Sequence, residues 1–287
     1  MRRKVGAFML VLIMILSLFS EPAYAVDSSH KQSSQIERIE ELAKVCTPTS
    51  SISTEDMQNF GEFWLYLKDL NLLSLDESGH LLLSDNLAIP DMYKDYLDMI
   101  DFINRLVDVK LLEISEAFDL KGLDITEESL ALISQESDDC LPPITPYYEP
   151  HDCQYPRLNV SYLCMQNYNT LSDFYDNMLL VASLYPDINP YISTVSFWIG
   201  KVGENCAWDY KTQPGYSPYS KVFCMSYGDY DYMHQTSEWL GNYNYGFTGS
   251  FLFSLDILHW GSSIASGLDP ADEEDWPAID EGYNDAP

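Results

Sequence analysis

The chain has 287 residues and a formal net charge of −30 at pH 7, because 45 acidic side chains are set against only 15 lysines and arginines. A surface that binds nucleic acid normally carries several clustered cations. After residue 161 the sequence offers only Lys201, Lys211 and Lys221. The composition therefore argues against a basic nucleic-acid-binding surface and predicts an acidic protein that repels polyanions.

Residues 1–25 have the pattern of a secretory signal peptide. The segment from Arg2 to Lys4 is basic, Phe8 to Phe19 is apolar but short for a bilayer, and Ala23-Tyr24-Ala25 is a small-x-small cleavage site. Cleavage after Ala25 predicts a secreted chain that begins at Val26. No cysteine follows the site directly and no later segment is apolar for long enough to span a membrane, so we expect no stable membrane anchor.

All six cysteines follow the predicted cleavage site, and an even number in an exported chain favours disulfides. We expect Cys206 to pair with Cys224, because this bond would close a loop around residues Trp208 to Lys211. Buried, reduced thiols are the alternative. No Cys-x-x-Cys or Cys/His spacing indicates a zinc site, and we expect neither a metal nor a cofactor.

Residues 26–139 are predicted to form a helical N-terminal domain. Ser34 starts a capping box, and further helices begin near Thr54, after Pro90 and near Thr126. We find no acid/base pair or ligand cluster in this region. A delivery, adaptor or shielding role for the next domain would fit such a module.

A proline-rich linker is predicted over residues 140–160, where five prolines disfavour both helix and central strand. The domain that follows, 161–287, is expected to contain a helix over 172–185 and another that begins at Pro190 with Asn189 as its N-cap.

Thr248 is expected to start an almost wholly apolar helix that ends at Gly267 and is buried on all sides. The predicted fold class is mainly α, with a small β-hairpin or loop region that makes the C-terminal domain α+β.

Two short clusters stand out in the last third of the chain. One is Trp208-Asp209-Tyr210-Lys211, and the other, from Gly241 to Gly249, reads GNYNYGFTG. Three glycines within nine residues suit a tight hairpin or loop where backbone approaches something closely. Alternatively, each cluster is a structural turn whose tyrosines fill a hydrophobic seam.

Together with an acidic tail, these clusters resemble the bacterial toxin 44 family of polymorphic toxin domains. That family carries a Trp-Asp-Tyr-Lys element, a Gly-Asn-aromatic-x-Tyr-Gly-x-Thr-Gly element, a long apolar helix and an Asp-x-x-Asp…Ile-x-x-Gly tail. Here the tail fits as Asp272-Glu273-Glu274-Asp275 with Ile279 and Gly282, and the resemblance runs from about Leu171 to the C-terminus. Asn244 stands where the family also has His, which removes one possible general base.

The candidate catalytic residues lie in or beside these clusters. We expect Asp209, Lys211, Asn242 and the Asp272/Asp275 pair to converge on one pocket at the N-terminus of the helix that starts at Thr248. There, backbone donors and the helix dipole would favour an anion. His234 is a candidate general base, and an exposed loop histidine is its alternative. The candidate substrate-binding residues are the aromatic and amide side chains of the clusters: Trp208, Tyr210, Tyr243, Asn244 and Tyr245.

Three functions remain open. The resemblance implies a secreted toxin-like effector in bacterial antagonism, a ribonuclease in which His234 or an Asp is the base and Lys211 stabilises the developing charge; an immunity protein is then a possible partner. The residues themselves favour hydrolysis of a peptidoglycan glycan strand by two carboxylates, because the region is rich in aromatic and acidic groups and poor in cations. A non-catalytic secreted binding protein is the third alternative.

Overall fold

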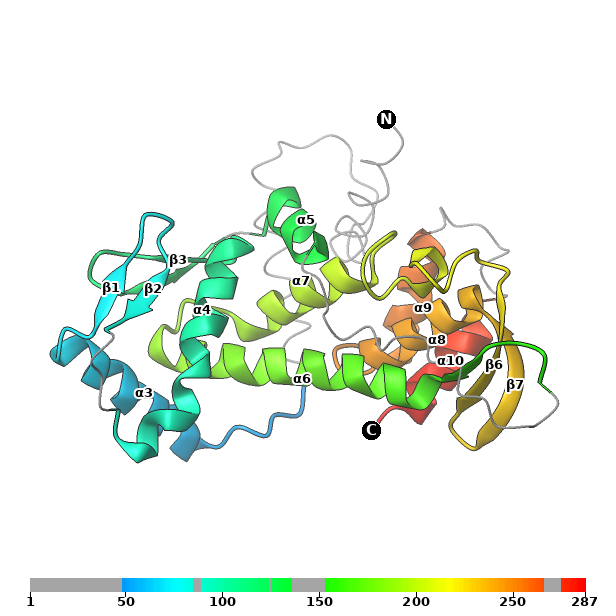
Figure 1. The fold of residues 1–287 in the computed structure, drawn as a ribbon, viewed down its shortest axis with the longest axis horizontal. Helices are drawn as coiled ribbons and strands as arrows, with labels where there is room; N and C mark the ends of the chain where they lie inside the picture. The colour runs from blue at the N-terminus through cyan, green and yellow to red at the C-terminus, as the bar shows by residue number, and fades with distance from the viewer. Residues whose placement is uncertain (1–47, 85–88, 124, 136–152, 266–274) are drawn as a thin grey trace. The chain divides into compact units, whose positions relative to one another are not determined.

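The structure is a computed structural model that describes residues 48–84, 89–123, 125–135, 153–265 and 275–287 (Figure 1). It is mostly helical with small sheets, so the predicted class, α+β and mainly α, is confirmed. The predicted signal peptide and most of the predicted linker lie outside the described residues. Among those described, no helix is both long enough and apolar enough for a membrane crossing.

The chain divides into two compact units. Among the described residues, the helix–hairpin unit lies within 49–133 and 172–197, and the sheet unit lies within 134–171 and 198–287. Two helices, α6 (Val160–Leu184) and α7 (Pro190–Val202), contribute to both units. Residues 172–197 therefore group with the N-terminal half.

The helix–hairpin unit is built on short helices whose apolar faces meet. Ser53 caps α3 (Thr54–Asp69) in a complete capping box with Asp56. A 3₁₀ turn, η1 (Asp91–Tyr96), then leads into α4 (Asp98–Asp108), and α5 (Glu127–Gln135) follows near Thr126 as expected. These helices bury aromatic and aliphatic residues that include Phe60, Phe63, Trp64, Ile103 and Leu106.

Two hairpins in this unit were not predicted. They are β1 (Leu73–Leu75) with β2 (Leu81–Leu83), and β3 (Leu112–Ile114) with β4 (Leu120–Gly122). Each strand has only three residues, which is too short to show a period of two in the sequence.

The sheet unit contains one three-stranded sheet in the order β5–β6–β7. Strand β5 (Arg157–Asn159) is parallel to β6 (Val222–Tyr227), and β7 (Tyr230–Thr236) is antiparallel to β6. A second 3₁₀ turn, η2 (Tyr210–Thr212), precedes the sheet's second strand. Three helices follow the sheet: α8 (Ser237–Gly249), α9 (Leu255–Ala265) and α10 (Trp276–Asp285). In Figure 1, α10 (red) lies against α8.

The glycine-rich cluster is helical, which corrects the expected hairpin or loop. Thr236 caps α8 by accepting a hydrogen bond from the Trp239 amide, and the helix continues through all three glycines to Gly249. Trp239, Tyr243 and Phe247 recur every fourth residue and pack on one another along one face. This aromatic face stabilises a helix that glycine content alone would disfavour.

Two further expectations are wrong. Thr248 lies at the end of α8 and does not start the apolar helix, which begins at Leu255 as α9. The expected Cys206–Cys224 bond is replaced by a disulfide between Cys153 and Cys224, and Cys206 is a buried free thiol. The parallel pairing of β5 with β6 brings the residues before β5 beside Cys224, and this contact is not visible in the sequence.

Candidate functional site

The loop after α7 is closed by a buried carboxylate. Asp209 is 4% exposed, and its Oδ2 accepts hydrogen bonds from the Asn205 amide at 2.8 Å and the Thr212 hydroxyl at 3.1 Å. Burial raises the pKa of Asp209, and these two hydrogen bonds and the charge of Lys211 oppose the rise. The local contacts of Asp209 therefore explain its presence without a substrate.

A buried chain of amides connects the two sequence clusters. The Asn167 amide nitrogen donates to the Tyr210 hydroxyl at 2.7 Å and to the Asn244 side-chain oxygen at 2.9 Å. The Asn244 nitrogen in turn donates to the Trp208 carbonyl at 3.5 Å. Tyr210 and Asn244 are completely buried and Trp208 is 2% exposed. These three predicted substrate-binding residues thus lie in the core.

The glycines of the second cluster and of the tail allow α8 and α10 to touch through their backbones. A Cβ atom on Gly246 would lie 2.1 Å from the Ile279 carbonyl oxygen, and one on Gly282 would lie 2.0 Å from that of Tyr243. Ile279 is 1% exposed. The tail from residue 275 on therefore forms a helix that packs on α8. Ile279 and Gly282, two residues of the family resemblance, lie at this contact.

The remaining aromatic members of the second cluster are also held by the fold. Tyr243 donates its hydroxyl to Asp285 at 2.8 Å, and Tyr245 donates to the Leu258 carbonyl at 3.2 Å. Burial raises the pKa of both tyrosines, so both hydroxyls stay protonated at neutral pH.

Lys211 and Asn242, two members of the predicted catalytic set, are half-buried. The Lys211 ammonium lies 5.3 Å from the centre of the Tyr219 ring, and the Lys211 side chain passes Gly241 of α8. The amide nitrogen of Asn242 is buried and has no hydrogen-bond partner among the described residues. The Lys211 side chain thus lies beside the turn of α8 that carries Asn242.

The helix N-terminus at which we expected the catalytic residues to converge is not at Thr248. Thr248 lies at the C-terminal end of α8, where the helix dipole presents partial negative charge and disfavours an anion. Asp275 precedes α10 and makes no side-chain cap, although its carbonyl accepts from the helix that follows. Asp272 lies outside the described residues.

His234 is exposed on β7 and contacts a different group. Its Nε2 lies 3.4 Å from the Cys153 sulfur, and the Tyr155 ring meets the imidazole edge-on at 5.0 Å. His259 on α9 is half-buried: it pairs with Asp280 at 2.5 Å and stacks on Trp276.

Sequence reasoning missed a carboxylate pair on α10. Glu281 and Asp285 are four residues apart, which places both on one face of the helix. Two tyrosine rings lie near these acids: Tyr243 donates its hydroxyl to Asp285, and the charges of Glu281 and Asp285 act on Tyr227. Trp239 packs on both rings, with its ring centre 4.4 Å from that of Tyr227 and 4.9 Å from that of Tyr243. We refer to these two acids and three rings as the α10 carboxylate cluster.

The two acids of this cluster have different environments. Burial raises the pKa of Glu281, and the nearby charge of Asp285 raises it further. One carboxylate oxygen of Glu281 is buried with no partner among the described residues. Asp285 is exposed and held by the Tyr243 hydroxyl. A signal for this pair existed in the four-residue spacing of positions 281 and 285, but the family pattern directed the sequence analysis to Asp272 and Asp275 of the same acidic tail.

Comparison with known proteins adds no relative: no family model matches the chain, and no curated protein or solved structure shows significant similarity to it.

Proposed function

We propose that the protein is a secreted, toxin-like effector whose sheet unit hydrolyses glycan strands, with peptidoglycan as the substrate class. The observation that carries the proposal is the α10 carboxylate cluster, in which Glu281 and Asp285 lie beside three aromatic rings. Glycoside hydrolysis needs one carboxyl that donates a proton and a second that acts as base or nucleophile.

The environments of the two acids fit these roles. Glu281 has a raised pKa and therefore retains a proton to a higher pH, as a general acid must. Asp285 is fixed by the Tyr243 hydroxyl, so its free oxygen is available to a water or to a sugar carbon. The half-buried ring of Trp239 offers an apolar surface on which a sugar ring stacks.

The cations of the sheet unit suit a polyanion less well. Lys201 is completely buried, Lys211 lies over Tyr219, Lys221 donates to the Gly215 carbonyl, and Arg157 lies over Tyr232. None of these contacts gathers several cations on one surface, which phosphodiester backbones normally require.

Ribonuclease activity is the second candidate, and the effect of the Lys211 charge on Asp209 favours it. The Lys211 charge lowers the pKa of Asp209 against the effect of burial. A carboxylate base beside a cation is the arrangement that metal-free RNA cleavage needs. This reading takes its substrate from the family resemblance.

One experiment separates these readings. The mature chain is incubated with purified peptidoglycan sacculi and, separately, with total RNA, and the products are analysed by mass spectrometry and on denaturing gels. We expect soluble glycan fragments, and we expect Glu281→Gln and Asp285→Asn each to slow their release at least about 100-fold. Asp256→Asn, which changes an exposed acid on α9, is the control and should leave the rate unchanged.

Two outcomes would contradict the glycan proposal. Cleavage of RNA that is lost in Asp209→Asn and Lys211→Ala would favour the ribonuclease. Binding to either polymer without any cleavage would favour a non-catalytic binding protein.

A further inference from the structure

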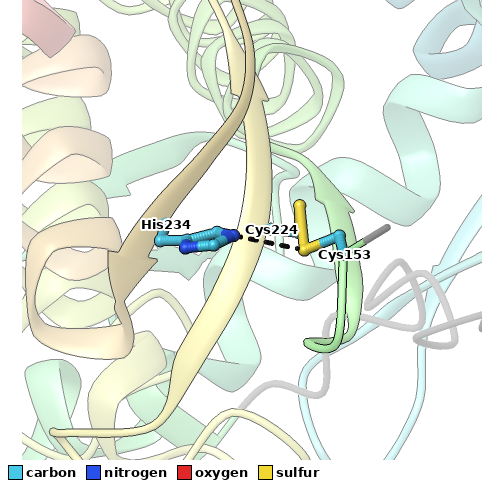
Figure 2. A group of neighbouring side chains, drawn as sticks. All are labelled: Cys153, Cys224 and His234. Atoms are coloured by element: carbon cyan, nitrogen blue, oxygen red, sulfur yellow. Dashed lines mark hydrogen bonds between the residues drawn. A yellow bond between two sulfur atoms is a disulfide. The ribbon is translucent and has the colours of Figure 1, made fainter. Parts of the chain in front are cut away.

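Three metal-ligating side chains meet at one edge of the sheet. The sulfur atoms of Cys153 and Cys224 and a ring nitrogen of His234 all lie within 4.8 Å of one another (Figure 2). The two sulfurs form a disulfide, and His234 Nε2 lies 3.4 Å from the Cys153 sulfur.

The fold fixes all three positions through the backbone of the sheet. Cys224 and His234 are directly opposite each other in the β6–β7 ladder, so their side chains project from the same face. The Cys224 amide donates to the Pro156 carbonyl at 2.8 Å, which ties the segment that carries Cys153 to β6. Tyr155, two residues after Cys153, meets the His234 ring edge-on.

We propose that reduction of this disulfide converts the three residues into a Cys₂His site for Zn²⁺ with its fourth position open to solvent. Zinc sites with three protein ligands and one exchangeable position are typical of this metal, which accepts mixed sulfur and nitrogen ligands. His234 is exposed and Cys153 half-exposed, so an ion reaches the site from solvent.

The chemistry balances with an external dithiol as the reductant. The dithiol gives two electrons to the disulfide and becomes a disulfide itself, and its two protons pass to the sulfurs of Cys153 and Cys224. Zn²⁺ then displaces both thiol protons, while neutral His234 binds through Nε2. The oxidised and the metal-bound forms exclude each other because both use the same sulfurs.

The required movement is small. With metal–ligand lengths of about 2.3 Å for sulfur and 2.0–2.1 Å for nitrogen, a tetrahedral site has a sulfur–nitrogen edge of about 3.5 Å. The distance between the Cys153 sulfur and His234 Nε2 is already 3.4 Å. The sulfur–sulfur edge must open from a bonded distance to about 3.8 Å by the same geometry. The Cys224 sulfur, which lies within 4.8 Å of the His234 ring nitrogen, must come to about 3.5 Å from it.

The test uses the mature chain with Cys46 and Cys140 replaced by serine, so that these two thiols cannot bind metal. The protein is reduced with a dithiol, freed of it under anaerobic conditions and titrated with Co²⁺, whose thiolate charge-transfer absorption reports sulfur ligation; Zn²⁺ is then added in competition. We expect one Co²⁺ per chain and displacement by one Zn²⁺. The oxidised protein should bind neither ion.

Matched variants assign the ligands. Loss of an outer-shell partner typically weakens metal affinity 10- to 100-fold, so His234→Ala and Cys153→Ser should each weaken it at least about 100-fold. Cys206→Ser and His80→Ala, which change a buried free thiol and a histidine of the other unit, should leave it unchanged. Circular dichroism of the reduced chain checks that the sheet unit stays folded. Unfolding on reduction, no binding by the reduced protein, or unaltered binding by His234→Ala would each overturn the proposal.

Discussion

Replacement of Gly282 by alanine tests the contact between α8 and α10. The added Cβ would lie 2.0 Å from the Tyr243 carbonyl oxygen, 2.8 Å from its carbonyl carbon and 3.0 Å from the Phe247 nitrogen. All three atoms belong to the backbone of α8, so no side-chain rotation relieves the overlap. Normal van der Waals contact requires α10 to move away from α8 by more than 1 Å, roughly, at this point.

The cost follows from the contacts that α10 then loses. Ile279 is 1% exposed, and returning a side chain of this size to water costs about 2 kcal/mol. Loss of the hydrogen bond from Tyr243 to the Asp285 carboxylate costs about 2 kcal/mol more. Alanine has a higher helix propensity than glycine, which returns about 1 kcal/mol. We therefore expect Gly282→Ala to lower the free energy of unfolding by about 3 kcal/mol.

Urea unfolding of the mature chain, followed by circular dichroism, measures this loss. Gly241→Ala is the matched control, because it adds the same methyl group within α8 where the nearest atom is Cδ of the Lys211 side chain at 3.9 Å. The control should be neutral or slightly stabilised. Equal midpoints for Gly282→Ala and Gly241→Ala would refute the account of the helix crossing.

Three further outcomes are expected. Ser53→Ala removes the N-cap of α3 and should lower the free energy of unfolding in urea by about 1 kcal/mol; an unchanged midpoint would contradict this. Because burial raises the folded-state pKa of Asp209, its contribution to stability falls as pH rises from the ordinary pKa of an aspartate through the folded-state pKa; Asp209→Asn should flatten that part of a pH series of melting temperatures. Burial raises the pKa of Cys206 to about 11, so iodoacetamide should modify it only after unfolding, and native-state labelling found by mass spectrometry would count against its burial.

Signals confined to a few neighbouring residues predicted structure well. Asn189 caps α7 as expected: its side-chain oxygen accepts hydrogen bonds from the amides of Tyr191 and Ile192, and Pro190 takes the first helical position. The helix at Thr54 also begins where the sequence indicates. In both cases the cap, the first turn and the apolar spacing lie within one stretch of chain, so tertiary contacts need not be known.

Features that depend on distant contacts were not predictable in the same way. Considered alone, Gly246 and Gly282 each indicate a turn. In the structure, a side chain at either position would collide with the backbone of the other helix. The partner of Cys224 is 71 residues away, and only the parallel register of β5 on β6 brings Cys153 to it. Helix α6 begins at Val160, twelve residues or so before the expected start, because the apolar face that continues it is buried in the sheet unit.

The clusters at 208–211 and 241–249 contain residue types that are common both in catalytic sites and in protein cores. The burial of each side chain shows which of the two roles it can have. Tyr210 and Asn244 are completely buried and bonded to one another through Asn167, so a substrate cannot reach them without opening the core. The acidic side chains that we propose as catalytic lie instead on α10, the helix that packs on α8 through these glycines. There Glu281 and Asp285 lie on either side of Gly282 in the sequence.

Substitution of Gly282 should therefore lower both stability and activity, whereas substitution of Glu281 should lower activity alone. Gly282→Ala moves the whole of α10 and should lower both the free energy of unfolding and the rate of glycan cleavage. Glu281→Gln keeps the size of a side chain whose buried oxygen has no partner among the described residues, so it should lower the rate alone. If Glu281→Gln instead cost as much stability as Gly282→Ala, Glu281 would be a structural residue of the crossing, and the proposed general acid would have to be sought elsewhere.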